Sequence, residues 1–233
     1  NLIVVPSDYF KNVVLNKIPG ISLSQLFVSA SGGVDKNIFT CLNSHISSTS
    51  TIVYVSRIDT GKGWDVLIDA VSELKSKRKI IGKRVLFVGY GTQTELLEKK
   101  IKELNLLEYC SYLGPKTHQE LNELYQVMHM ACDSLAMYRL NMKESSTLKS
   151  KECILHNLPF LFSTPDPDLY SIKDYLYDCS NTEDIFDLSN VIEHYSKIDK
   201  EKMIDDFKCC LTNTLSWEIK VNKLYQWILN NKS

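Results

Sequence analysis

Residues 51–91 read TIVYVSRIDTGKGWDVLIDAVSELKSKRKIIGKRVLFVGYG and alternate between apolar runs and an amphipathic pattern. The runs Thr51 to Val55 and Arg84 to Val88 are short, apolar and rich in β-branched residues, so each predicts a buried strand. Between them, Asp65 to Lys79 repeats apolar residues at helical spacing. A strand, a helix and a second strand of these lengths predict a right-handed βαβ unit in a parallel sheet.

The same alternation continues along the chain and predicts an α/β fold. We expect a Rossmann-like parallel sheet with helices on both faces, whose ligands bind at the carboxyl ends of the strands. Further strands are expected at Leu2 to Ser7, Gln25 to Ala30, Tyr109 to Leu113, Cys132 to Met137, Pro159 to Phe162 and Tyr175 to Asp178. Further helices are expected at Asp8 to Asn16, Thr92 to Leu104, Thr117 to Met128, Ser146 to His156, Asp184 to Tyr195, Lys200 to Thr212 and Trp217 to Leu229.

Composition excludes several classes of protein. The 233 residues carry 27 basic and 28 acidic side chains, a net charge of −1 that argues against a nucleic-acid-coating surface. Hydrophobic residues make up 44% of the chain, enough for a packed core. The seven cysteines are dispersed and form no C-x-x-C, which predicts reduced core thiols, no metal site and a cytoplasmic protein.

Two cations stand in the loop that follows the first strand of residues 51–91. Arg57 is one of four arginines in the chain, and Lys62 lies five residues further on. The loop lacks the glycine and the hydroxyl residue that a Walker A loop needs at positions 56 and 63. At the carboxyl end of a strand, these cations could bind an anion, or they could be solvated surface charges.

A short glycine motif, Gly89-Tyr-Gly91, follows the second strand and precedes a helix. It is half of a dinucleotide fingerprint, because Thr94 occupies the third glycine position. Two glycines at this place indicate that the backbone comes close either to a ligand or to a helix.

Two glutamates flank a predicted helix start. Glu144 precedes Ser145-Ser146-Thr147, a natural N-cap sequence, and Glu152 lies roughly 9–12 Å further along the axis by helical rise. Free amides at a helix N-terminus bind phosphate, while carboxylates on either side accept hydrogen bonds from hydroxyls. A sugar linked to a nucleoside diphosphate has this layout. Glycoside hydrolysis by paired carboxylates, or plain solvation, are the alternatives.

Together these motifs resemble the family 4 glycosyltransferases, which are retaining enzymes of the GT-B fold. The similarity covers nearly the whole chain. Glu144 and Glu152 match the family's E-x7-E motif, with Lys149 and Leu158-Pro159 among the matching neighbours. Arg57 with Lys62-Gly63 matches the family's R-x4-K-G motif, and Gly89-Tyr-Gly91 matches its G-x-G motif. The stretch that follows in the family is matched by Leu113-Gly114, Glu120-Leu121 and Tyr125. The family's N-G-V-D-x3-F segment is matched by Gly33-Val34-Asp35 and Phe39, with Gly32 in place of the asparagine.

The resemblance implies the donor-binding, C-terminal half of a GT-B enzyme. Its substrate would be a nucleotide sugar such as a UDP-sugar or GDP-sugar, with no further cofactor and no metal. Arg57 and Lys62 would bind the diphosphate, Glu152 the ribose hydroxyls and Glu144 the transferred sugar. The implied catalytic residues are Arg57, Lys62 and Glu144; the implied donor-binding residues are these three with Gly32, Gly33, Gly89, Gly91, Ser146, Thr147, Leu148 and Glu152.

The resemblance also implies a division of the chain. Residues 1–28 would be a remnant of the acceptor-binding N-terminal domain, 29–214 the nucleotide-sugar-binding domain, and 215–233 a helix that packs on the N-terminal domain. That domain would be the main partner and the only route to a membrane, and this chain alone would bind donor but transfer poorly. Many members of the family build bacterial glycans. Ser145-Ser-Thr147 replaces the usual Gly-Phe-Gly, so the sugar is not assigned.

Two other functions stay open at this point. A sugar-nucleotide epimerase of the same fold would interconvert sugars without an acceptor. A non-catalytic nucleotide-binding or protein-binding module would share the sheet without the reaction. A response-regulator receiver is disfavoured, because Ser56-Arg57 stands where an acidic cluster is expected.

Overall fold

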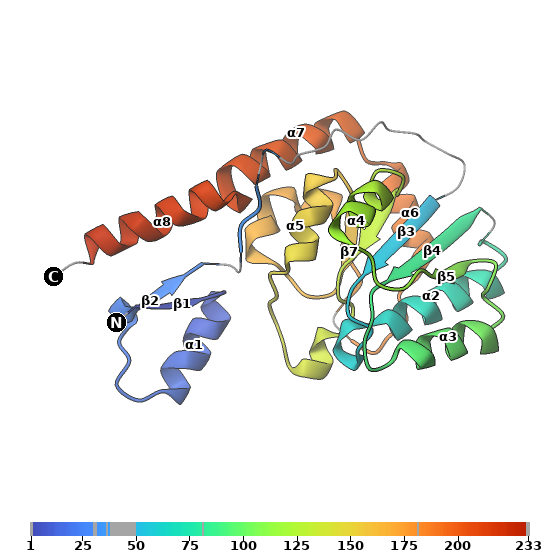
Figure 1. The fold of residues 1–233 in the computed structure, drawn as a ribbon, viewed down its shortest axis with the longest axis horizontal. Helices are drawn as coiled ribbons and strands as arrows, with labels where there is room; N and C mark the ends of the chain where they lie inside the picture. The colour runs from blue at the N-terminus through green and yellow to red at the C-terminus, as the bar shows by residue number, and fades with distance from the viewer. Residues whose placement is uncertain are drawn as a thin grey trace.

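The computed structural model describes residues 2–29, 32–35, 37, 50–80, 82–180 and 182–231. Within them the chain forms a six-stranded parallel sheet and a separate two-stranded parallel sheet (Figure 1). Helices cover both faces of the larger sheet, so the expected α/β, Rossmann-like fold is confirmed.

The larger sheet has the strand order β5-β4-β3-β6-β7-β8, with β3 and β6 at its centre. Its register places Tyr54 beside Phe87 of one neighbour and beside Cys132 of the other. The strands are β3 (Ser50–Val55), β4 (Lys83–Val88), β5 (Cys110–Tyr112), β6 (Met130–Cys132), β7 (Phe160–Phe162) and β8 (Tyr177–Asp178).

The alternation along each strand separates two apolar clusters, one on each face of the sheet. Ile52 and Tyr54 pack with α2 (Trp64–Ser76), α3 (Thr94–Glu103) and α6 (Leu188–Ser196). Val53, between them, packs on the opposite side with α4, α5 and α7. These last helices span His118–Tyr125, Leu148–Leu155 and Lys200–Cys210.

Helix starts follow the predicted capping residues. Thr117 and Glu120 form the expected capping box, in which the Glu120 Oε2 accepts from the Thr117 N–H at 2.8 Å. Thr147 caps α5 by accepting from the Ser150 N–H at 3.2 Å. These bonds satisfy amides that have no partner inside the helix.

Most expected elements differ from the observed ones by a few residues at their ends, and two are displaced for reasons that the structure shows. The strand expected over Cys132 to Met137 lies instead at Met130–Cys132, because the Asp133 carboxylate accepts from the Ser134 N–H at 2.6 Å and the chain turns away there. The helix expected from Asp184 begins at Leu188, where Asp187 is the N-cap. Short 3-10 segments over Met137–Leu140 and Pro167–Tyr175 were not predicted.

The smaller sheet pairs β1 (Ile3–Val5) with β2 (Leu26–Val28) around α1 (Asp8–Lys17). α8 (Trp217–Asn230) extends from the main body to this unit, where the Phe27 and Trp227 rings lie 5.6 Å apart (Figure 1). The connection after β2 runs beside the start of α8, since Val34 bridges Ser216 in parallel. The two chain segments that join the smaller sheet to the main body, the connection after β2 and α8, therefore begin side by side.

The six described cysteines are free, and all but Cys209 are buried. Five of the six thus lie in the core as expected, whereas Cys209 does not, and the reduced state stays a prediction. Cys41 and Phe39 lie outside the described part of the chain.

Candidate functional site

The predicted site residues come from loops at the carboxyl edge of the six-stranded sheet. The β3–α2 loop carries Arg57 and Lys62, and the β4–α3 loop carries Gly89 and Gly91. The loop from β6 to α5 carries Glu144 and the N-cap of α5. This is the edge at which ligands of such sheets bind.

Lys62 is half-buried at the end of a short 3-10 turn, Thr60–Lys62, that follows β3. Its backbone carbonyl accepts from the Tyr54 hydroxyl at 3.0 Å and from the Leu135 N–H at 3.1 Å, which fixes the loop against β3 and β6. Burial, together with the nearby Lys149 ammonium, lowers the pKa of Lys62. The Asp133 and Asp59 charges partly offset this, but no carboxylate of the described residues lies within ion-pair distance of the Lys62 Nζ.

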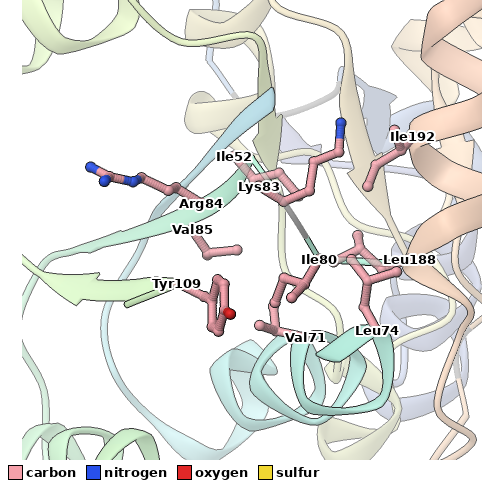
Figure 2. A pocket seen from close by; sticks show the side chains of 10 residues that line it. All are labelled: Ile52, Val71, Leu74, Ile80, Lys83, Arg84, Val85, Tyr109, Leu188 and Ile192. Carbon is pink, nitrogen blue, oxygen red and sulfur yellow. The ribbon is translucent and has the colours of Figure 1, made fainter. Parts of the chain in front are cut away.

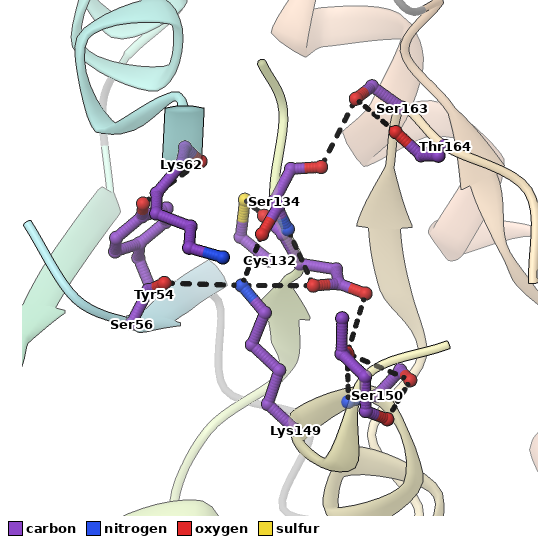
Figure 3. A network of polar contacts seen from close by, with 11 residues as sticks. Tyr54, Ser56, Lys62, Cys132, Ser134, Lys149, Ser150, Ser163 and Thr164 are labelled. Carbon is purple, nitrogen blue, oxygen red and sulfur yellow. Dashed lines mark hydrogen bonds and ion pairs between the residues drawn. The ribbon is translucent and has the colours of Figure 1, made fainter. Parts of the chain in front are cut away.

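Lys149 and Asp133 are site residues to which sequence reasoning gave no role. The Lys149 Nζ lies 2.9 Å from the Asp133 Oδ1 and donates to the Ser134 Oγ at 3.0 Å and the Ser56 Oγ at 3.4 Å. Figure 3 shows the Lys62 and Lys149 side chains pointing toward one another. Asp133 directly follows a strand and Lys149 lies in the first turn of α5, so the rule that identified Arg57 and Lys62 could have found both.

Arg57 lies at the rim of the site, with its side chain 72% exposed. Its Nε is 2.8 Å from the Asp59 Oδ2, while the Asp59 Oδ1 accepts from the Thr92 N–H and hydroxyl, both at 2.9 Å. The Thr92 bonds, and more weakly the Arg57 charge, lower the pKa of Asp59. Asp59 thus links Arg57 to the β4–α3 loop.

Gly89 and Gly91 allow two loops to touch. A Cβ at Gly89, where φ is +129°, would lie 1.9 Å from the Ser56 carbonyl oxygen. A Cβ at Gly91 would lie 2.4 Å from the Ile58 carbonyl oxygen. The sequence analysis expected the glycines to approach a ligand or a helix, whereas in the structure they approach the β3–α2 loop. Their donor-binding role stays a prediction.

The N-terminus of α5 faces the segment that connects the two sheets. Thr147, besides capping the helix, donates from its Oγ1 to the Asp133 Oδ2 at 3.0 Å. A Cβ at Gly32 would lie 2.6 Å from the Leu148 Cδ2, so the two segments are in contact. The Glu144 Oε2 is buried without a hydrogen-bond partner, although the side chain as a whole is only partly buried.

Glu152 lies half-buried on α5. It interacts electrostatically with His118 and Tyr125 of α4. Burial raises the pKa of its carboxyl group, and the nearby His118 side chain partly offsets this. A buried carboxylate needs hydrogen-bond donors to remain charged. Donor hydroxyls of a ligand would provide them.

A buried charge cluster, which the sequence did not reveal, ties the site to α8. Lys151, fully buried on α5, donates to the Ser146 Oγ at 2.7 Å and to the Gly32 carbonyl at 3.3 Å. Lys220 of α8 reaches the Asp168 Oδ2 at 2.6 Å, and Lys151 lies 3.8 Å from the same atom. The loop of Ser146, the connection at Gly32 and α8 are therefore mechanically linked.

The enclosed cavity in Figure 2 lies at the opposite, amino edge of the sheet. Its volume is about 10 Å³, and apolar side chains such as Ile52, Val71 and Leu188 line most of it. It has room for one water at most. The motif residues and this cavity are thus separate features.

Two absences concern the described residues. None of their His, Cys, Asp and Glu side chains gather in threes as a metal site requires. None of their helices combines the length and apolarity needed to cross a bilayer. Metal independence and a cytoplasmic location stay predictions.

Solved structures with the same fold include a glycosyltransferase. The chain superposes on a glycosyltransferase from Rickettsia africae with a TM-score of 0.76 and 16% identity, covering 100% of this chain and 64% of that chain. For HepE from Anabaena, in complex with UDP and glucose, the TM-score is 0.74 and the identity 15%, covering 98% of this chain and 63% of that chain. For sucrose-phosphate synthase from Thermosynechococcus elongatus, the TM-score is 0.73 and the identity 16%, covering 97% of this chain and 58% of that chain. The fold is that of the C-terminal half of GT-B proteins.

Part of the chain also matches a family model. Residues 43–137 match the family model described as glycosyl transferases group 1, which confirms the resemblance at that level. Assignment to the retaining family 4 stays a prediction. No curated protein matches the chain at a significant level. The chain spans less than two thirds of the solved proteins named above.

Proposed function

We propose that this chain is the donor-binding part of a glycosyltransferase. The observation that carries the proposal is the half-buried Lys62 ammonium at the carboxyl edge of β3, which forms no direct ion pair with a carboxylate of the described residues. Burying a charge without a partner is unfavourable, and a bound diphosphate removes that cost. Structural neighbours crystallised with UDP or UDP-glucose support a nucleotide sugar as the ligand.

The reaction we propose is transfer of a hexose-type sugar with retention of configuration. Arg57 and Lys62 stabilise the negative charge that develops on the departing diphosphate, which is the largest expected catalytic contribution. Glu144 accepts hydrogen bonds from sugar hydroxyls through its unpartnered Oε2, and Glu152 accepts from the ribose. The amides of Ser146, Thr147 and Leu148, with the segment at Gly32 and Gly33, complete the donor site.

Acceptor binding and transfer would require a further domain. α8 carries four exposed apolar side chains at intervals of four residues, on one stripe of the helix: Trp217, Val221, Tyr225 and Leu229. We propose that this stripe packs on an acceptor-binding domain and that this chain alone transfers poorly. Synthesis of a bacterial glycan in the cytoplasm is the setting that the family resemblance suggests.

A thermal-shift panel tests this function. UDP, GDP and their sugar conjugates should raise the melting temperature, since a ligand that binds the folded state stabilises it by mass action. Free glucose and free phosphate at the same concentration should have much smaller effects. A folded chain whose melting temperature responds to no nucleotide would contradict the proposal. Interconversion of sugar nucleotides without an acceptor would favour an epimerase instead.

A further inference from the structure

Lys149 lies across the gap between the two central strands. Its ammonium reaches Ser56, which follows β3, and Asp133 with Ser134, which follow β6. Its backbone belongs to the first turn of α5, and its side chain is 14% exposed. Contacts to both strand ends place this charge beside Lys62, inside the region where the proposed diphosphate would bind (Figure 3).

We infer that Lys149 is a third cation that binds the donor diphosphate, and that Asp133 is its counter-ion while the site is empty. This inference rests on the proposed function. Two ammonium groups and one carboxylate leave this cluster with one uncompensated positive charge. An incoming diphosphate carries more than one negative charge, so it makes use of both lysines.

Asp133 is anchored independently of Lys149. Its Oδ1 accepts from the Ser134 N–H at 2.6 Å and its Oδ2 from the Thr147 hydroxyl at 3.0 Å. Asp133 therefore keeps its place when the Lys149 ammonium turns toward a phosphate, because two donors still satisfy its oxygens. The flexible lysine stem moves, whereas the helix cap and the strand end stay fixed.

A purely structural ion pair makes a different prediction. If Lys149 only ties α5 to β6, its removal lowers the melting temperature and leaves nucleotide affinity unchanged. If Lys149 binds phosphate, its removal weakens diphosphate binding and leaves binding of the nucleoside alone unchanged. The affinity of the folded variant for a nucleoside diphosphate therefore distinguishes the two roles.

Titration calorimetry with UDP, GDP and the free nucleosides decides between them. Lys149→Met should weaken binding of the tighter diphosphate about tenfold, as expected for a charge-assisted hydrogen bond, and Lys149→Arg should recover most of the loss. Nucleoside affinity should not change. Lys197→Met is the matched control, because it also removes one lysine and one ion pair, with Glu193, at the exposed C-terminal end of α6.

A second variant makes the test independent of how Lys149→Met folds. Asp133→Asn keeps a hydrogen-bond acceptor but removes the competing charge, so it should tighten diphosphate binding about threefold. Equal affinity in wild type and Lys149→Met, or unchanged or weaker binding by Asp133→Asn, would overturn the inference alone. Absence of any diphosphate binding by the wild-type chain would overturn the proposed function as well.

Discussion

Alanine substitutions at three glycines separate the two reasons for which a glycine is needed here. Gly89→Ala meets both a steric clash, 1.9 Å from the Ser56 oxygen, and an unfavourable φ of +129°. Gly91→Ala meets only a clash, 2.4 Å from the Ile58 oxygen. Gly114→Ala meets only a positive φ of +70°, because nothing lies within 4 Å of its Cβ position.

The expected costs follow from these values. A positive φ costs an alanine about 1 kcal/mol at Gly114 and about 1–3 kcal/mol at Gly89, where φ is more extreme. Forcing two backbone segments apart costs typically about 1–3 kcal/mol, and the clash at Gly89 is the shorter one. We therefore expect losses in the free energy of unfolding of about 1 kcal/mol for Gly114→Ala, about 2 for Gly91→Ala and about 4 for Gly89→Ala.

Urea unfolding followed by tryptophan fluorescence measures the series. Trp64 is 2% exposed at the start of α2 and reports on the main body. Equal losses for Gly89→Ala and Gly114→Ala would refute the close approach of the two loops. If Gly91→Ala weakens nucleotide binding by more than its unfolded fraction explains, Gly91 also contacts the donor directly.

Three further predictions concern single side chains. Glu152→Gln should weaken UDP binding but leave 2′,3′-dideoxy-UDP binding unchanged in calorimetry, because only ribose hydroxyls need the carboxylate; an equal loss for both ligands would contradict this role. The pKa of Asp166, raised to about 6 mainly by burial, lies above its unfolded value of 3.8, so its charged form destabilises the folded state. As pH rises from 4 to 7, wild type should lose about 2–3 kcal/mol of stability relative to Asp166→Asn in urea titrations; a pH-independent difference would argue against the shift. Thr117→Ala should cost about 1 kcal/mol through loss of the α4 cap, and Thr117→Ser, which keeps the hydroxyl, should retain most of it if the cap is the cause.

The sequence predicted best what local patterns control. The runs at Thr51 to Val55 and Arg84 to Val88 fall within observed strands, because β-branched and apolar residues suit the centre of a covered sheet. The Thr117 capping box was predicted because all its members lie within four residues. In both cases the physical cause is contained in the segment itself.

What the sequence did not reveal depends on neighbours distant along the chain. Lys149 finds Ser56 across 93 positions, and Lys151 finds Gly32 across 119, so neither pairing has a local signal. The same is true of the end of β6, where Asp133 turns toward Thr147 of the next helix. The motif residues were found by spacing, whereas these long-range pairings required the fold.

The proposed function depends most on binding of the donor diphosphate by the Lys62 ammonium. Calorimetric titration of UDP and GDP into wild type, Lys62→Met and the control Lys197→Met tests it directly. Wild type and the control should bind a nucleoside diphosphate with equal affinity, and Lys62→Met should bind it at least about tenfold more weakly. Equal binding by Lys62→Met, or no binding by folded wild type, would contradict it.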